Sequence, residues 1–314
     1  MKVVITGGAG FIGGHFVRQI ADQNSTNQVS KIIVIESLTY ASNLKFIFDL
    51  IDSKQIEFLQ ADICDAEKIK TAITDCDLLV NFAAESHVDN SIGNSSPFIK
   101  TNILGVENLL RLALENNVKR FVQISTDEVY GSIPIGEATE SAVLDPSSPY
   151  SASKASADLL VLSYGKTHKL NVLVTRSCNN FGINQHREKF IPKTIVAALR
   201  NENIVVYGDG RNIREWINVQ DNCRAIMNLI ADTGSTGVFN LSSGLRLSNL
   251  EVVERVLKLV PTSTSNIEFV SDRKGHDFRY AIKSSRINNK FEYSSSQFNL
   301  DLIKTIDWYR KNAN

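Results

Sequence analysis

The glycine-rich stretch GGAGFIG at residues 7–13 constrains the fold of this chain more than any other feature. It directly follows the apolar run KVVIT at residues 2–6 and opens a segment with helical spacing, which predicts a strand–turn–helix unit. Gly8, Gly10 and Gly13 form the pattern G-x-G-x-x-G, in which small residues allow a tight turn and bring a pyrophosphate close to a helix N-terminus. The pattern alone is weak, because glycines at such a turn can serve packing only.

An acidic residue strengthens the dinucleotide interpretation. Glu36 follows the strand-like run KIIVI, at roughly the 20-residue distance expected for an acid that binds the ribose. A carboxylate there accepts hydrogen bonds from the 2′-hydroxyl and repels a 2′-phosphate, which favours NAD over NADP. We therefore predict an NAD site. Asp62, after a third strand-like run, is a candidate adenine contact or an ordinary surface residue.

Strand-like and helix-like segments alternate up to about residue 176. The strand-like runs cover residues 2–6, 31–35, 57–59, 78–82, 120–124 and 171–175. The helix-like segments include residues 13–22, 101–116 and 152–167. Continuously apolar strands in such an alternation are typical of a parallel sheet covered on both faces, and right-handed crossovers make it doubly wound. We predict an α/β fold with a Rossmann-type doubly wound parallel sheet.

The alternation loosens after residue 176, where we predict a smaller α/β lobe that binds substrate. We assign residues 1–176 to the NAD-binding domain and residues 177–314 mainly to the smaller lobe, with residues 212–232 as a candidate return to the first domain. Residues 179–189 are polar and are predicted to be a loop. Short strands are expected at 205–209, 238–241 and 267–270, and helices at 221–231 and 301–311.

Composition excludes several classes of protein. The formal net charge is zero, so no basic excess indicates nucleic acid or an anionic membrane as a partner. No apolar run approaches the ~18 residues of a membrane span, and the strand-like start suggests no signal peptide. We expect no metal site and a reduced, cytoplasmic protein, because no metal-ligand spacing relates the cysteines, which are Cys64, Cys76, Cys178 and Cys223.

A tyrosine and a lysine supply the first candidate chemistry. Tyr150 and Lys154 lie four residues apart, hence on one helical face. A phenol is a poor base at neutral pH, but a lysine cation and the positive nicotinamide ring both favour the phenolate. Tyr150 is therefore a candidate acid and base for interconverting an alcohol and a ketone. The spacing is common by chance, and it gains weight from the glycines and from the hydroxyls of Ser125 and Thr126.

Together these motifs resemble the extended short-chain dehydrogenase/reductase superfamily, which holds the NAD-dependent epimerases and dehydratases. In STDEVYG, residues 125–131, two acids stand where the epimerase branch typically has non-acidic residues. This stretch is similar to the nucleotide-sugar 4,6-dehydratases, most closely those that act on dTDP-glucose. The resemblance covers nearly the whole chain. Its further stretches are ESLTYASN, AAESHVDNSI, PSSPYSASKASAD, CNNFG, EKFIPKTI, YGDGRNIREW and DRKGHDFRYAI.

The resemblance implies an NAD-dependent hydro-lyase that converts dTDP-glucose to dTDP-4-keto-6-deoxyglucose. NAD would take hydride from C4 and return it to C6. Tyr150 would remove the 4-hydroxyl proton, Thr126 would bond that hydroxyl and Lys154 would hold the nicotinamide ribose. Glu128 would take the C5 proton, and Asp127 would donate a proton to the departing 6-hydroxyl. Repulsion between the two acids, with burial, should raise one pKa; the alternative is that both only solvate a turn.

The resemblance also implies which residues bind the cofactor and the substrate, by their positions in the matching motifs. The cofactor contacts that the resemblance implies are Gly7, Gly10, Phe11, Ile12, Gly13, Glu36, Ser37, Leu38, Thr39, Asp62, Ile63, Ala83, Ala84, Ser86, Thr101, Tyr150 and Lys154. The implied substrate contacts are Ser86, Thr126, Asn180, Lys189, Phe190, Tyr207, Arg214, Arg273 and His276. The two arginines would clamp the diphosphate. We expect His15, His168 and His186 at the surface and Trp216 in the core.

Other readings remain open. The same reaction on UDP-glucose or another UDP-hexose is the first alternative, because CNNFGI and REW depart from the SNNYGP and RDW common in the family. An epimerase leaves Asp127 and Glu128 unexplained. A non-catalytic NAD-binding regulator need not keep both acids with Thr126, Tyr150 and Lys154. The family also implies a homodimer, joined by the helix at 101–116 and the helix after Tyr150.

Overall fold

The computed structural model describes residues 1–23, 29–287 and 295–312. Its centre is a seven-stranded parallel sheet with the strand order β10-β6-β5-β4-β1-β2-β3. The strands are β1 (Lys2–Thr6), β2 (Lys31–Glu36), β3 (Glu57–Gln60), β4 (Leu78–Asn81), β5 (Arg120–Thr126), β6 (Val172–Ser177) and β10 (Gly237–Leu241). The chain moves outward from β1 to β3 and then returns to the other side of β1, so the predicted doubly wound sheet is confirmed.

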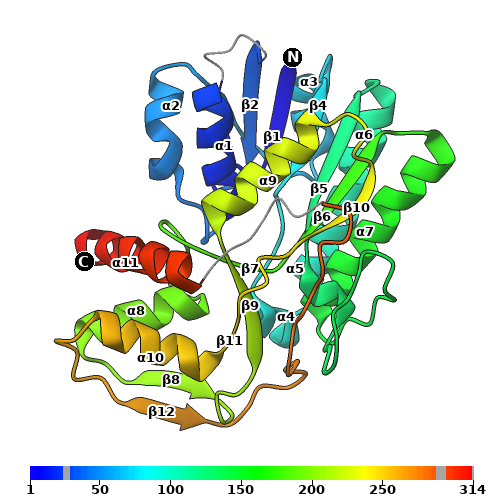
Figure 1. The fold of residues 1–314 in the computed structure, drawn as a ribbon. Coiled ribbons are helices and arrows are strands. Elements are labelled where there is room, and N and C mark those ends of the chain that lie inside the picture. The colour runs from blue at the N-terminus through cyan, green and yellow to red at the C-terminus, as the bar shows by residue number, and fades with distance from the viewer. Residues whose placement is uncertain (24–28, 288–294, 313–314) are drawn as a thin grey trace.

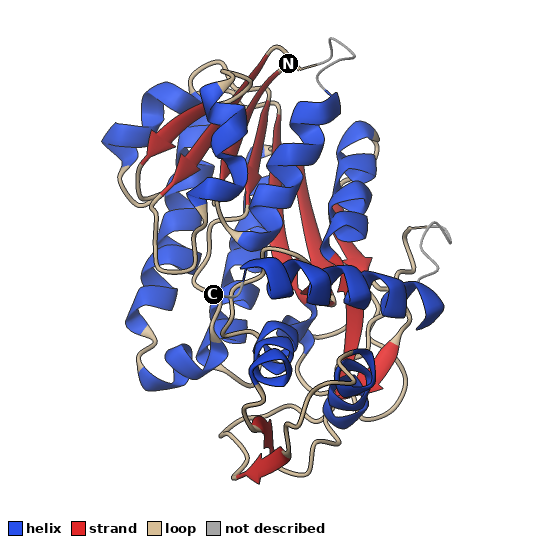
Figure 2. Ribbon diagram, turned by 90° about the vertical axis from the view of Figure 1, so that its left-hand side faces the viewer, coloured by secondary structure: helices blue, strands red, loops and turns tan. Residues whose placement is uncertain are grey.

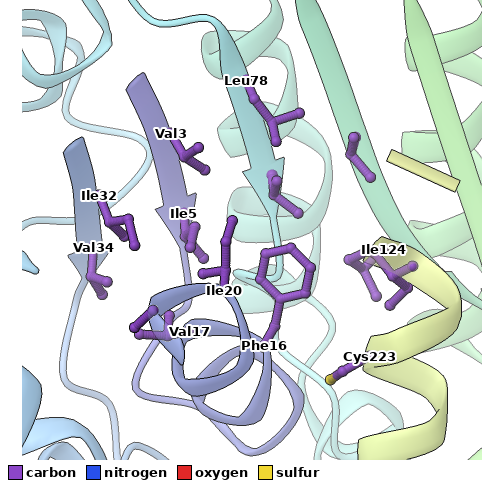
Figure 3. Close-up of a cluster of buried hydrophobic side chains, with 14 of the residues drawn as sticks. Val3, Ile5, Phe16, Val17, Ile20, Ile32, Val34, Leu78, Ile124 and Cys223 are labelled. Carbon is purple, nitrogen blue, oxygen red and sulfur yellow. The ribbon is translucent and has the colours of Figure 1, made fainter. Parts of the chain in front are cut away.

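Helices cover both faces of this sheet (Figure 2). One face carries α1 (Phe11–Gln23), α2 (Phe48–Asp52) and α9 (Val219–Ala231), and the other carries α3 (Ala66–Ile73), α6 (Val106–Glu115) and α7 (Pro149–His168). Side chains alternate along each strand, so Val3 and Ile5 point into the first layer while Val4 points into the second. Figure 3 shows Phe16 of α1 and Cys223 of α9 in the first layer.

The smaller lobe lies below the sheet in Figure 1. Its three-stranded sheet has the order β11-β9-β7, and a parallel pair, β12 and β8, lies apart from it. The strands are β7 (Asn179–Phe181), β8 (Ile204–Tyr207), β9 (Ile213–Asn218), β11 (Arg246–Ser248) and β12 (Ile267–Val270). The helices are α8 (Phe190–Arg200), α10 (Asn249–Leu259) and α11 (Ser295–Asn312). Trp216 is buried in their shared core, as predicted.

Several elements differ from the sequence-based expectation. The predicted loop at 179–189 contains strand β7, and α8, α10, β9 and β11 were not predicted. The predicted helix at 101–116 begins with a π-helical stretch, η3 (Lys100–Gly105), and only then becomes α6. The remaining short elements are η2 (Leu44–Ile47), α4 (Val88–Gly93), α5 (Ser96–Ile99) and η4 (Asp127–Tyr130).

Residues 219–241 return to the first half of the chain. Helix α9 packs against α1, and β10 pairs with β6 as the edge strand of the large sheet. Val219, Cys223 and Ile226 share a hydrophobic cluster with side chains of β1 and α1. The division of the chain into domains at residue 176 stays a prediction. None of the described helices is long and apolar enough to cross a membrane.

Candidate active site

A cavity of about 820 Å³ opens at the carboxyl ends of the central strands. Its walls include Gly7 after β1, Ser37 after β2, Ala83 after β4 and Asp127 after β5. These ends flank the boundary between β1 and β4, where the chain reverses its direction of winding. Such a reversal point is where open parallel sheets bind ligands.

The glycine turn presses directly against the end of β4. Gly7 has a φ of +70°, and a Cβ added there would lie 2.5 Å from the backbone nitrogen of Ala83. A Cβ on Gly13 would lie 2.2 Å from the carbonyl oxygen of Gly7. The turn therefore tolerates no side chain at either position, and it brings the N-terminus of α1 to the cavity wall as the motif predicts.

Glu36, at the end of β2, ties the glycine turn to the loop that follows β2. Its Oε2 accepts a hydrogen bond from the backbone N–H of Ala9 at 3.1 Å, and its Oε1 accepts from the N–H of Leu38 and the hydroxyl of Ser42. The carboxylate is buried, yet it lines the cavity. It is thus fixed in place and open on one side, which suits an acceptor for a ribose hydroxyl.

The start of α7 fixes the tyrosine and lysine. Ser148 and Ser151 form a capping box that begins the helix. The Nζ of Lys154 donates to the carbonyl oxygen of Ile124 at 2.6 Å, and the backbone N–H of Tyr150 donates to the Oγ of Ser91. Both Tyr150 and Lys154 are buried and line the cavity. The local helix geometry thus delivers both groups to the end of β5.

Burial opposes the charged forms of both residues. It lowers the pKa of Lys154 to about 8, although the carboxylate of Asp158 counteracts it. Burial and the negative charge of Glu128 raise the pKa of Tyr150, while a hydrogen bond with Thr126 lowers it. The prediction that the lysine and the nicotinamide ring together favour the phenolate stays a prediction, because the protein groups by themselves raise the pKa of Tyr150. Desolvation and the nearby carboxylate thus favour the neutral phenol.

The two acids at the end of β5 have different surroundings. Asp127 is buried, and its Oδ2 has no hydrogen-bond partner among the described residues. Burial, followed by the charges of Glu128 and Glu215, raises its pKa well above the usual range. Burial also raises the pKa of Glu128, but Arg273, Arg214 and Lys189 all counteract that rise. Asp127 is therefore suited to remain a neutral acid and Glu128 to carry a charge.

The cavity brings most of the predicted cofactor residues together. Of that predicted set, Leu38 alone does not line it, and it contributes only its N–H bond to Glu36. The predicted catalytic residues also meet on its wall. They are Thr126, Asp127, Glu128, Tyr150 and Lys154. Their roles stay a prediction, whereas their proximity is a property of the fold.

Predicted substrate residues fall into two groups. Ser86, Thr126, Asn180 and Lys189 line the cavity. The other predicted substrate residues do not line the cavity. These are Phe190, Tyr207, Arg214, Arg273 and His276.

The two arginines of this second group still lie close enough to Glu128 to affect its pKa. Arg214 lies over the ring of Tyr280 at 4.2 Å and donates to the carbonyl oxygen of Asp277. Arg273 forms an ion pair with Asp89 at 3.5 Å, and its Nε is buried without a hydrogen-bond partner among the described residues. The predicted diphosphate clamp stays a prediction, with a free donor on Arg273 in its favour.

One of the three histidines expected at the surface, His15, was assigned wrongly. His15 is buried and its Nε2 lies 3.0 Å from the carbonyl oxygen of Ile183, because α1 packs against the loop after β7. Burial lowers the pKa of His15 to about 4. His186 lines the cavity beside Glu188. His168 is exposed, as predicted.

Other residues of the cavity wall were not predicted at all. Glu85, Asn94, Ser96, Lys100, Asn179, Gln185 and Glu188 belong to this group. The buried side-chain oxygens of Asn179, Asn180 and Gln185 have no hydrogen-bond partner among the described residues. Such atoms are costly to leave unpaired, so they are candidates for contact with a bound molecule. The polar composition of residues 179–189 was the available signal, but it indicates only a loop.

Comparisons with known proteins agree with this geometry. A family model described as GDP-mannose 4,6 dehydratase matches residues 4–305. The low-salt glycan biosynthesis protein Agl12 of Haloferax volcanii is 47% identical over 98% of this chain and 98% of its own length. A dTDP-glucose 4,6-dehydratase of Actinoplanes is 42% identical over 99% of this chain and 98% of its own length. A similar solved structure is that of DesIV, a dTDP-glucose 4,6-dehydratase of Streptomyces venezuelae crystallised with NAD and TYD bound. Its TM-score is 0.94, and it is 41% identical over 99% of this chain and 98% of its own.

The tight glycine turn yields a testable prediction. Gly7→Ala is expected to destabilise the fold by about 1–3 kcal/mol, since alanine rarely adopts a positive φ, and to weaken dinucleotide binding at the cavity wall. Denaturant unfolding and a dinucleotide titration measure the two effects. Gly93→Ala is the matched control, because nothing lies within 4 Å of a Cβ added there. Equal stability and affinity in both variants would show that the turn does not need a glycine.

Proposed function

This chain belongs to the GDP-mannose 4,6 dehydratase family, and we propose that it converts dTDP-glucose to dTDP-4-keto-6-deoxyglucose with NAD as its cofactor. The observation that carries the proposal is the meeting of Asp127, Glu128, Tyr150 and Lys154 on one cavity wall. An alcohol oxidation needs only the tyrosine and lysine. The two acids supply what an elimination of water requires in addition, which is one proton donor and one base.

The cavity fits a dinucleotide. The turn at Gly7 and Gly13 leaves room for a pyrophosphate at the start of α1, Glu36 offers an acceptor for a ribose hydroxyl, and Lys154 offers a buried donor. When bound, NAD would supply a nicotinamide ring able to take up hydride from C4 of the sugar and to give it back at C6, with a positive charge that would favour the phenolate of Tyr150. The relative DesIV was crystallised with NAD bound, which supports this choice of cofactor.

Tyr150 and Thr126 act at the sugar 4-hydroxyl. The phenolate of Tyr150 takes the hydroxyl proton, and the Oγ1 of Thr126 orients the same hydroxyl. The hydrogen bond between Thr126 and Tyr150 holds the two groups together and favours the phenolate. The ammonium group of Lys154, held by the carbonyl oxygen of Ile124, places a positive charge beside this proton transfer.

Asp127 and Glu128 act at the next two carbons. The new 4-ketone acidifies the C5 proton, which passes to the carboxylate of Glu128. Asp127, whose pKa burial and the charge of Glu128 hold high, donates its proton to the departing 6-hydroxyl, and water leaves. Glu128 then returns its proton to C5 as hydride reaches C6. The proton that Tyr150 took from the 4-hydroxyl replaces the one that Asp127 gave to water, which resets the site. Burial raises the pKa of Glu128, but three cationic side chains, Arg273, Arg214 and Lys189, limit that rise and thus favour its use as a base.

A UDP-hexose is the alternative substrate. The chain departs from common family patterns at CNNFGI and REW, which lie beside the nucleotide and sugar positions, and so the base and hexose are less constrained than the reaction. The names of the relatives favour a thymidine nucleotide. An epimerase, and a non-catalytic regulator that binds NAD, both leave the buried acid pair without a role.

Incubation of the purified protein with dTDP-glucose and with UDP-glucose in separate reactions tests the proposal. We expect a base-labile 4-keto product, measured by its ultraviolet absorbance in alkali, from dTDP-glucose. Product from UDP-glucose and none from dTDP-glucose would show that the substrate carries uridine and not thymidine. Absence of product from both sugars would favour another hexose or the regulator.

The acid pair gives a second prediction. Asp127→Asn and Glu128→Gln are each expected to lower the rate of water loss by about 100-fold to 10,000-fold, the range of one general acid or base. Both variants should still bind NAD, because neither amide changes the glycine turn or Glu36. Product formation and NAD content are measured in parallel. Unchanged turnover in both variants would remove the two acids from the mechanism.

We further propose that the protein is a cytoplasmic homodimer. Ile99, Leu104 and Leu159 are exposed apolar side chains on α5, η3 and α7, the region that this family uses for dimer contacts. Burial of this face against a second copy would remove it from water. Sedimentation is expected to give twice the mass of the chain at micromolar concentration, and a monomer there would contradict the proposal.

A further inference from the structure

The loop between β7 and α8, residues 182–189, closes one side of the cavity. Gln185, His186, Glu188 and Lys189 of this loop line the wall. The loop comes from the smaller lobe, whereas the wall opposite comes from the loops after β1, β2 and β4. Its contacts with those loops therefore determine how easily the two sides of the cavity separate.

The base of this loop is held by buried contacts. The carbonyl oxygen of Ile183 lies 3.0 Å from the Nε2 of His15 on α1. The side-chain Oδ1 of Asn184 accepts a hydrogen bond from the Nδ2 of Asn43 at 2.5 Å. His15 and Asn184 are both buried. These contacts fix residues 183 and 184 against the dinucleotide-binding half of the protein.

The far end of the loop is held differently, by exposed groups. The hydroxyl of Tyr40, in the loop after β2, donates to the Oε1 of Glu188 at 3.2 Å and accepts from the Nδ2 of Asn90 at 3.3 Å. The Nζ of Lys189 donates to the carbonyl oxygen of Ser86 at 2.8 Å. Tyr40 thus bridges the loop after β2, the region after β4 and the loop before α8.

The surroundings of Glu188 keep its carboxylate in this position. His87 and His186 lie on two sides of it, with nitrogen–oxygen distances of 3.8 and 3.7 Å. The ring of Tyr40 meets that of His186 edge to face. A tyrosine phenol, with an ordinary pKa of about 10, keeps its proton at neutral pH and so remains a donor to Glu188.

Thr39 and Ala41, on either side of Tyr40, line the cavity, as does Glu188. We propose that the contact between Tyr40 and Glu188 is a clasp that joins these two parts of the wall and slows the release of NAD. The clasp rests on the proposed function, in which the same NAD is oxidant and reductant within one turnover. Loss of the cofactor between the two hydride transfers would leave the sugar oxidised at C4 and the reaction incomplete. Slow release therefore matters more here than in an enzyme that exchanges its cofactor each cycle. Tyr40 and Glu188 are positioning residues in this scheme, and neither acts on the sugar.

The rate at which bound NAD leaves the protein tests the clasp. Protein loaded with NAD is freed of unbound cofactor by gel filtration, diluted, and sampled over time for the NAD that remains bound, measured in acid extracts. Tyr40→Phe removes only the hydroxyl and should shorten the half-time of NAD release about fivefold, the effect expected from one hydrogen bond. Glu188→Ala should shorten it at least as much.

A matched control and a double variant separate the clasp from general loosening. Glu202→Ala makes the same chemical change beyond the other end of α8, away from the cavity wall, and should leave the half-time unchanged. In the double variant, Tyr40→Phe should add little to Glu188→Ala, because the two residues act through one contact. Melting temperatures of all variants should stay close to that of the unaltered protein.

The half-times of NAD release in these variants can overturn the clasp in different ways. Equal half-times in the unaltered protein, Tyr40→Phe and Glu188→Ala would overturn the clasp and leave the proposed function intact. Fully additive effects of the two substitutions would overturn the direct coupling between Tyr40 and Glu188. Failure of the unaltered protein to bind NAD would overturn both the clasp and the proposed function. Addition of excess NAD should restore turnover in Tyr40→Phe, since that substitution affects only retention.

Discussion

Desolvation at the end of β5 is the constraint on which the candidate chemistry depends. Strand β5 is buried along its whole length and delivers Asp127 and Glu128 into a region that α7 covers with Tyr150 and Lys154. In water these four groups would titrate near their ordinary pKa values. Burial shifts each of them toward its neutral form, and the uneven supply of cations then distinguishes the two acids. The fold thereby turns two adjacent carboxyl groups into unlike reagents.

The parts of this site that could be predicted from sequence are those fixed by local geometry. The glycines sit in one turn, Glu36 ends the next strand, and the spacing of Tyr150 and Lys154 places both on one turn of a helix. Each of these patterns needs only a few consecutive residues and one general rule of strand or helix geometry. The parallel doubly wound sheet follows in the same way from apolar strands that alternate with helices.

What could not be predicted depends on contacts between distant segments. His15 looks like an ordinary polar residue on α1 until the carbonyl of Ile183 is packed beside it. Burial and the charge of Glu128 raise the pKa of Tyr150, an effect that the spacing to Lys154 does not reveal. Arg214 and Arg273 reach the neighbourhood of Glu128 through the tertiary fold of the smaller lobe. Helices α8 and α10 are a different case, because their local signals were present and were missed, among them the capping box of Ser248 and Glu251 before α10.

The late return of α9 and β10 to the large sheet has a consequence for how the chain is made. Helix α1 and strand β1 emerge from the ribosome early, but the apolar layer that they begin is completed only by residues 219–241. Until synthesis has passed residue 241, the nascent chain carries an unfinished hydrophobic surface and an unpaired β6 edge, the features that invite association with other chains or with chaperones. Protection from proteolysis therefore comes late in translation, after β10, the last strand of the large sheet, has been released.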